Sequence, residues 1–184
     1  MILPKVIFVH APRCSGTSIE HSLMNGDRVP DPVKHYNATQ IRATVGEEEW
    51  LSSFKFGIVR NPFDRVASPY ITEDRSIIRD VGNMHSGLSM KQFIERYKPQ
   101  PWEYGTQCSD YMNEDLDLII KYEARSVGIA IANRELEKYG LLIDESVVKR
   151  NHKNKKKDFM SYFDDESEAL VRARFSDDFE RWYK

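Results

Sequence analysis

Eight residues that follow an apolar segment have the composition of a phosphate-binding loop. The segment Val6–Val9 is wholly apolar, and residues 11–18 then read Ala-Pro-Arg-Cys-Ser-Gly-Thr-Ser. Between a strand and a helix, such a loop binds phosphate through its backbone N–H groups and the positive end of the helix. The loop G-x-x-x-x-G-K-[ST] of ATP-binding proteins would need lysine at Thr17 and glycine at Ala11. Because the cation within this loop is Arg13, we expect a phosphate donor other than ATP.

A second candidate anion-binding group, Arg60, follows the apolar segment 54–59. Asn61 can cap a helix that starts there, and Pro62 suits its first position because the missing N–H is not needed at that point. Arg60 is therefore expected at a strand-to-helix turn, with Ser68 about two helical turns farther along.

The hydrophobic pattern predicts the elements that position these residues. We expect strands at 5–10, 54–59 and 116–122, and helices at 17–24, 39–45, 89–97, 127–139 and 166–183, with a further helical turn at 47–51. Strands that alternate with helices favour a three-layer α/β/α fold with a mostly parallel sheet. A chain of 184 residues with 40% hydrophobic content can bury one core, so we expect a single domain over residues 1–184.

Composition narrows the class of protein. The chain has 27 Lys and Arg residues and 29 Asp and Glu residues, which gives a net charge of -2. The overall charge therefore does not favour binding to nucleic acid or to an anionic membrane. The longest apolar runs are far too short to span a membrane, and no leader precedes them. Cys14 and Cys108 have no redox or metal spacing, and the five histidines are scattered. We therefore expect a cytoplasmic monomer or homodimer without a membrane span, a nucleic-acid partner or a metal.

Two segments resemble the nucleotide-binding motifs of the carbohydrate-type (family 2) PAPS-dependent sulfotransferases. Residues 10–18, HAPRCSGTS, are similar to the 5'-phosphosulfate loop of that family, H-x-P-K-[TC]-[AG]-G-T-S. Residues 56–70, FGIVRNPFDRVASPY, are similar to its 3'-phosphate motif, F-x-x-V-R-N-P-[FWY]-D-R-x-x-S-x-Y. Segments 35–50, 107–111 and 158–183 also resemble the family, and 71–100 matches it least.

The resemblance implies a P-loop nucleoside triphosphate hydrolase-like fold and a sulfotransferase activity. The sulfuryl group would pass from 3'-phosphoadenosine 5'-phosphosulfate (PAPS) to a hydroxyl acceptor, with a carbohydrate or glycoconjugate as the expected class. The product would be adenosine 3',5'-bisphosphate (PAP), and this chemistry requires no metal. The nucleotide-binding residues would be Arg13, Cys14, Ser15, Gly16, Thr17, Ser18, Arg60 and Ser68. The basic loop 149–157 adds Lys153 and Lys155, because a family loop before the closing helix folds over the nucleotide.

Two residues are candidates for catalysis. His35 is the expected general base, since an imidazole titrates near neutrality and this histidine matches the family position before Thr-x-x-x-Ile-Arg. Arg13 stands where the family has lysine. Its guanidinium can stabilise charge on the departing oxygen but does not deprotonate as an ammonium can. His10, which closes the first strand, is expected to be structural, and Cys14 to fill the tight loop rather than act as a nucleophile.

Two other functions remain open. A phosphotransferase of the P-loop class would use ATP, but Thr17 stands in place of the necessary lysine. A protein that binds PAP or PAPS without turnover would fit the replacement of lysine by Arg13.

Overall fold

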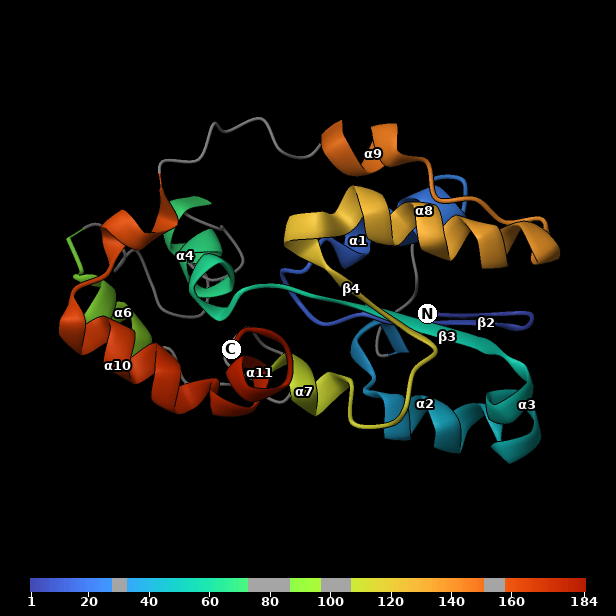
Figure 1. The fold of residues 1–184 in the computed structure, drawn as a ribbon, viewed down its shortest axis with the longest axis horizontal. Helices are drawn as coiled ribbons and strands as arrows, with labels where there is room; N and C mark the ends of the chain where they lie inside the picture. Colours follow the sequence, from blue (N-terminus) through green and yellow to red (C-terminus); the bar gives the residue numbers. More distant parts are fainter. Residues whose placement is uncertain (28–32, 73–86, 97–106, 151–157) are drawn as a thin grey trace. The chain divides into compact units, whose positions relative to one another are not determined.

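A computed structural model describes residues 1–27, 33–72, 87–96, 107–150 and 158–184 (Figure 1), with only the backbone described at 33, 72, 149 and 150. These residues form two compact units, each made of two chain segments. We call Met1–Arg60 with Cys108–Asn154 the sheet unit, and Asn61–Gln107 with Lys155–Lys184 the helical unit. The single sulfotransferase domain expected over residues 1–184 stays a prediction.

The sheet unit is built on an open four-stranded sheet with the order β1-β2-β3-β4. The strands are β1 (Ile2–Leu3), β2 (Val6–Val9), β3 (Phe54–Val59) and β4 (Leu118–Lys121). Strands β2, β3 and β4 run parallel, and β1 is antiparallel to β2. The predicted α/β class with a mostly parallel sheet is therefore confirmed. The sequence pattern does not predict β1, because two residues are too few to show a period of two.

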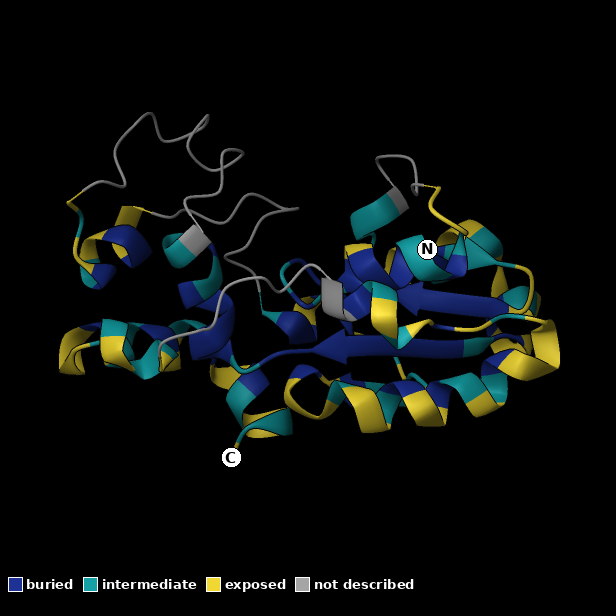
Figure 2. Cartoon of the chain, turned by 90° about the horizontal axis from the view of Figure 1, so that it is seen from above, coloured by how far each residue is buried: buried dark blue, intermediate teal, exposed yellow. Residues whose placement is uncertain are grey.

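Helices of the sheet unit lie on both faces of this sheet (Figure 1). Figure 1 shows α1, α8 and α9 on one side and α2 and α3 on the other. Strand β2 is wholly buried between them, as its colour in Figure 2 shows, which explains why the strand carries four apolar residues in succession. The helical elements are α1 (Gly16–Leu23), η1 (Val33–His35), α2 (Ala38–Val45), α3 (Glu47–Ser52), α7 (Cys108–Tyr111), η2 (Tyr122–Ala124), α8 (Arg125–Leu136), η3 (Glu137–Tyr139) and α9 (Glu145–Arg150).

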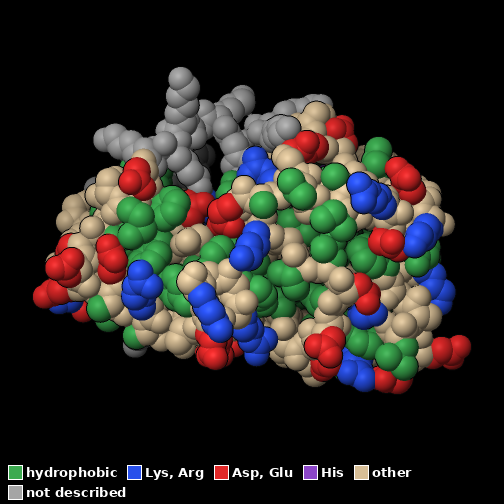
Figure 3. All heavy atoms as spheres, viewed as in Figure 1, with side chains coloured by type: hydrophobic (Ala, Val, Ile, Leu, Met, Phe, Trp, Pro, Cys, Tyr) green, Lys and Arg blue, Asp and Glu red, His purple; other side chains and the backbone are tan. Residues whose placement is uncertain are grey.

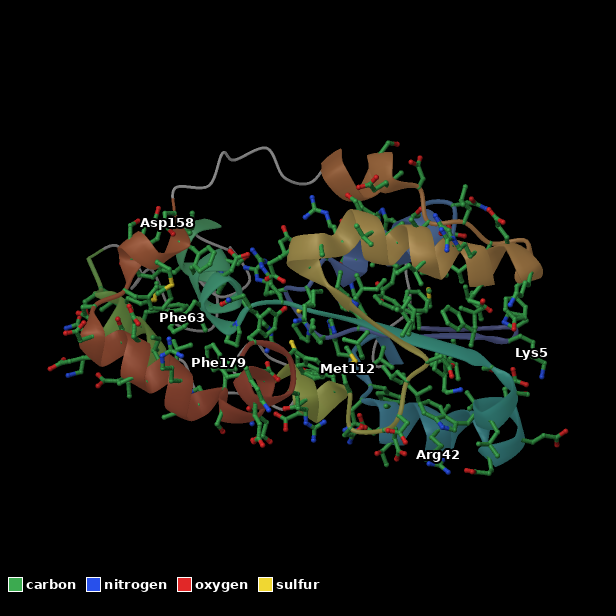
Figure 4. The ribbon with its side chains drawn as sticks, in the orientation of Figure 1. Lys5, Arg42, Phe63, Met112, Asp158 and Phe179 are labelled. Atoms are coloured by element: carbon green, nitrogen blue, oxygen red, sulfur yellow. The ribbon has the colours of Figure 1, made fainter. Side chains whose placement is uncertain are left out.

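Helix α2 is fixed at both ends by side chains. At its start the Asn37 side chain accepts from the Gln40 backbone N–H at 2.8 Å, and the Gln40 side chain accepts from the Asn37 N–H at 2.9 Å, which is a capping box. Toward its end, Arg42 (labelled in Figure 4) pairs with Glu47 on α3 and with Glu114, which precedes β4. These contacts anchor the helix that directly follows the segment carrying the candidate base.

The helical unit packs its helices around an apolar cluster. Its elements are α4 (Pro62–Thr72), α6 (Met90–Arg96), η4 (Phe159–Tyr162), α10 (Asp165–Arg174) and α11 (Ser176–Trp182). Buried side chains from α4, α6 and α10 form the centre of the cluster, which includes Phe63, Phe93 and Phe175. Phe63 and Phe179, both labelled in Figure 4, have ring centroids 5.4 Å apart. As predicted, Asn61 precedes α4 and its side chain accepts from the Phe63 N–H at 3.0 Å.

The single closing helix predicted at 166–183 is wrong, because the chain forms two helices that meet at Phe175. Phe175 is 1% exposed and has φ -116° and ψ 32°, outside the helical region. The Gln107 side chain accepts from the backbone N–H of Asp177 at 2.8 Å and of Asp178 at 3.4 Å. A partner distant in the sequence thus satisfies N–H groups at the start of the second helix, which periodicity alone does not reveal.

Candidate functional site

The candidate residues of the sheet unit lie at the carboxyl ends of three adjacent parallel strands. Strand β2 leads into the phosphate loop, β3 leads into Arg60, and β4 leads into Tyr122. In the pairing register, Val59 on β3 lies opposite Lys121 on β4. Arg60 and Tyr122, which follow these two residues, are therefore neighbours. Ligands of open α/β sheets bind outside the carboxyl ends of the strands, and the topology therefore gathers the candidates where a ligand would bind.

The phosphate loop contains two non-glycine residues in the left-handed region. Arg13 has φ 65° and Ser15 has φ 68°, conformations that side chains with a Cβ rarely adopt and that each cost about 1 kcal/mol or more. Ser15 is the N-cap of α1, and its carbonyl accepts from the N–H of Ser18 at 3.1 Å and of Ile19 at 3.3 Å. Strain of this kind concentrates at ligand-binding turns, and the loop opens directly onto a helix N-terminus.

Gly16 is required at its position because the ring of His10 lies directly against it. A Cβ at Gly16 would overlap the Cδ2 and Nε2 atoms of His10. His10 closes β2 and Gly16 opens α1, so this close approach sets how the loop leaves the strand and enters the helix.

His10 is held by a buried carboxylate. Its Nδ1 lies 2.8 Å from Oε1 of Glu20, and the two residues are 2% and 1% exposed. Lys34 Nζ lies 3.7 Å from the other carboxylate oxygen. Burial lowers the pKa of His10, so the neutral imidazole donates its Nδ1–H to Glu20. His10 is thus a structural support beneath the loop, in agreement with the sequence analysis.

His35 lies next to this support, on η1. Its ring centroid is 4.7 Å from that of His10, and its Nδ1 donates to the His10 carbonyl at 3.5 Å. Burial, followed by the charge of His10, lowers the pKa of His35 to about 4. The side chain is therefore neutral at physiological pH, and a proton on Nδ1 leaves Nε2 as the basic nitrogen. The neutral Nε2 can accept a proton, and the lowered pKa makes it a weaker base than an unperturbed imidazole.

Arg60 is buried and is joined to the phosphate loop. It is 3% exposed, and its Nη1 donates to the carbonyl of Arg13 at 2.8 Å. Its guanidinium carbon also lies 4.3 Å from the ring centroid of Tyr122. The structure thus brings together two of the predicted residues, and it adds Tyr122.

The remaining loop residues differ in exposure. Thr17 is exposed, whereas Ser18 is 5% exposed. Cys14 is fully buried, with its Sγ 3.7 Å from Sγ of Cys108. The thiol of Cys14 therefore packs inside the unit.

Three other predicted residues belong to the helical unit or lie outside the described residues. Ser68 lies on α4 in the helical unit, partly exposed. Lys153 and Lys155 lie outside the described residues, as does most of segment 71–100, which matches the family least. Their contribution to a site stays a prediction.

Sequence reasoning missed four residues of the cluster. Glu20 and Lys34 support the loop from α1 and η1, and Tyr122 and Arg125 follow β4. Only Tyr122 has a sequence signal, since it lies one residue beyond the last strand residue, in the same relation as Arg60 to β3. The hydrogen bond between His10 and Glu20 depends on tertiary packing.

The face of the molecule drawn in Figure 3 carries charges of both signs. On the face drawn in Figure 3, acidic and basic side chains are interspersed, as a net charge of -2 suggests. Within the described ranges, no three His, Cys, Asp or Glu side chains gather as a metal site would need. No helix in the same ranges has the length and apolar character that crossing a membrane demands.

Searches of protein-family models, curated proteins and solved structures found no match to the chain.

Proposed function

We propose that the chain is a PAPS-dependent sulfotransferase of the P-loop nucleoside triphosphate hydrolase-like fold. It would move a sulfuryl group from PAPS to a hydroxyl acceptor and release PAP. The observation that carries this proposal is the buried guanidinium of Arg60, bonded to the backbone of a strained loop at a helix N-terminus. Two anion-binding groups thus lie at adjacent strand ends, and PAPS has an anion at each end of its nucleoside.

The phosphate loop suits the 5'-phosphosulfate. Backbone N–H groups of Cys14, Ser15 and Gly16, with the hydroxyls of Thr17 and Ser18, can donate to the 5'-phosphate oxygens. Arg13 adds the positive charge that stabilises the departing phosphate oxygen. Because guanidinium stays protonated, this role of Arg13 is electrostatic.

Arg60 suits the 3'-phosphate. A guanidinium fork matches phosphate oxygens, and a 3'-phosphate would add charge-assisted hydrogen bonds to it. A nucleotide without a 3'-phosphate, such as ATP, would therefore bind less well. Ser68, Lys153 and Lys155 remain proposed partners of the nucleotide.

His35 is the proposed base that accepts the proton of the acceptor hydroxyl at Nε2. Its neutral state at pH 7 supports this role. The stack on His10 and the bond to the His10 carbonyl hold the ring in place. Glu20 and Lys34 would then act as positioning residues.

Replacing His35 with alanine should abolish transfer while leaving nucleotide binding intact. General-base catalysis contributes roughly 10²- to 10⁴-fold, so transfer should fall by that factor, and the dissociation constant of PAP should change by less than about twofold. We would measure transfer from labelled PAPS to a panel of sugars, glycolipids and small alcohols. In the wild type, kcat/KM should stay level near pH 7 and fall as pH drops toward the pKa of about 4, since protonated His35 accepts no proton.

His21→Ala is the matched control, because His21 lies on α1 of the same unit and has no proposed role. It should retain full transfer. Equal turnover in His35→Ala and the wild type would remove His35 from the role of base. If the wild type binds PAP but transfers sulfuryl to no acceptor, the chain is a binding protein without turnover.

A further inference from the structure

Tyr122 lies beside Arg60 because the two residues follow paired positions of neighbouring strands. Val59 on β3 pairs with Lys121 on β4, and Arg60 and Tyr122 come directly after them. Tyr122 opens η2 and is 8% exposed, while Arg60 is 3% exposed. The register of a parallel pair therefore buries an aromatic ring and a guanidinium together at the carboxyl end of the sheet.

The charged end of Arg60 makes the contact between these two side chains. The guanidinium carbon lies over the Tyr122 ring, 4.3 Å from its centroid, well inside the limit of about 6 Å for a cation on an aromatic ring. Packing that only covered the apolar stem of Arg60 would not require the charged group to lie over the ring. Because both side chains are buried, the attraction is stronger than it would be at an exposed site.

The ring and the phosphate loop constrain the guanidinium in different ways. Its Nη1 donates to the carbonyl of Arg13 at 2.8 Å, whereas the Tyr122 ring attracts its charge through the π-system. An electrostatic contact with a ring leaves N–H donors of the guanidinium for oxygen acceptors, and an arginine has five such donors. Tyr122 therefore restricts the position of Arg60 without competing for the hydrogen bonds that a phosphate would accept.

A side chain that is ordered before binding favours the binding of an anion. Ordering a flexible side chain during binding lowers the affinity, and a side chain that is already ordered avoids this loss. The loop carbonyl and the ring both hold Arg60 in the absence of a ligand. Because a planar guanidinium binds phosphate oxygens only in the correct direction, its orientation affects how well it binds a phosphate.

We propose that Tyr122 is a positioning residue that orients the Arg60 guanidinium toward the 3'-phosphate of the nucleotide. The inference rests on the proposed function, because it takes PAPS and PAP as the ligands. It adds Tyr122 as a residue on which the preference for a nucleotide bearing a 3'-phosphate depends.

Tyr122→Leu should weaken PAP binding roughly 3- to 30-fold, the range expected for a cation–π contact. Adenosine 5'-monophosphate lacks the 3'-phosphate, so its binding should change by less than about twofold. Tyr122→Phe keeps the ring and should bind PAP within about threefold of the wild type. Calorimetric titration of each variant with both nucleotides measures these changes. Tyr139→Leu is the matched control, since Tyr139 is an exposed tyrosine of the same unit, and it should bind both ligands as the wild type does.

A double-mutant cycle separates an effect through Arg60 from a structural effect of the ring. If the ring acts by orienting Arg60, its loss should matter little once Arg60 is replaced by alanine. The double variant Arg60→Ala with Tyr122→Leu should therefore bind PAP within about twofold of Arg60→Ala alone. Losses that add would show that the ring acts independently of Arg60 and would overturn the inference.

Tyr122 also contacts Arg125, and this second contact needs its own control. The guanidinium carbon of Arg125 lies 4.8 Å from the ring centroid. Arg125→Ala removes that contact but keeps the one with Arg60, so PAP binding should stay within about threefold of the wild type. A loss as large as that of Tyr122→Leu would show that the ring acts through Arg125, which overturns the inference.

The remaining outcomes also decide the question. Unchanged PAP binding in Tyr122→Leu overturns the inference, and so does an equal loss for both nucleotides, because the ring would then act on the loop or on the fold. If Tyr122→Phe binds PAP as weakly as Tyr122→Leu, the hydroxyl is responsible and the inference is wrong. A wild type that binds no PAP overturns the proposed function itself, which distinguishes the two failures.

Discussion

Arg60→Ala should weaken PAP binding by about 3 kcal/mol, roughly a hundredfold. Arg60 is 3% exposed and donates to the backbone of the phosphate loop, so the substitution removes both the proposed phosphate contact and the contact that holds the loop. Calorimetric titration with PAP measures the loss. Adenosine 5'-monophosphate should lose less affinity than PAP, because it lacks the phosphate that Arg60 is proposed to bind.

Two variants make the Arg60 result interpretable. Arg60→Lys keeps the charge but not the planar fork, so it should recover part of the affinity. Arg134→Ala removes an exposed arginine of the same unit and should leave PAP binding unchanged. An unaltered dissociation constant in Arg60→Ala, with the variant folded by its melting temperature, would refute the assignment.

Gly16→Ala should destabilise the sheet unit and weaken nucleotide binding together. The added Cβ would overlap the ring of His10, which is 2% exposed and bonded to Glu20. Because the ring cannot move without breaking that buried bond, the loop or the start of α1 must shift. Overpacking of this kind costs up to about 3 kcal/mol. Urea unfolding and PAP titration of the same sample measure the two effects.

Gly26→Ala is the control for adding a methyl group. A Cβ at Gly26 meets no atom within 4 Å, although its φ of 98° adds strain, so only stability should fall and PAP binding should not. If Gly16→Ala itself binds PAP as the wild type does, the close approach of Gly16 to His10 does not set the geometry of the loop.

Elements with local signals were predictable from sequence. Strand β3 was predicted at its observed bounds, since its apolar run and the Asn61-Pro62 helix start frame it. Gly140, which adopts φ 69°, signalled the end of the helical stretch that α8 and η3 form together. The closing helix was mispredicted because its break depends on Gln107, about 70 residues away in the chain.

The candidate site likewise contains residues that the sequence pattern identified and residues that it did not. The loop residues and Arg60 were identifiable because each follows a strand and precedes a helix, and consecutive residues of the sequence are enough to show this pattern. The pair of His10 and Glu20 that supports the loop was not identifiable from sequence. These residues lie ten positions apart and meet only when β2 and α1 pack together. The contact between Arg60 and the Tyr122 ring was missed for a similar reason, since it depends on the register between β3 and β4.

The most direct test of the account is a calorimetric titration of the wild-type protein with PAP and, separately, with ATP. The structure has a buried arginine beside a phosphate loop whose usual lysine position is Thr17, so the account predicts micromolar or tighter binding of PAP and at least tenfold weaker binding of ATP. Micromolar binding of ATP with no binding of PAP would contradict it.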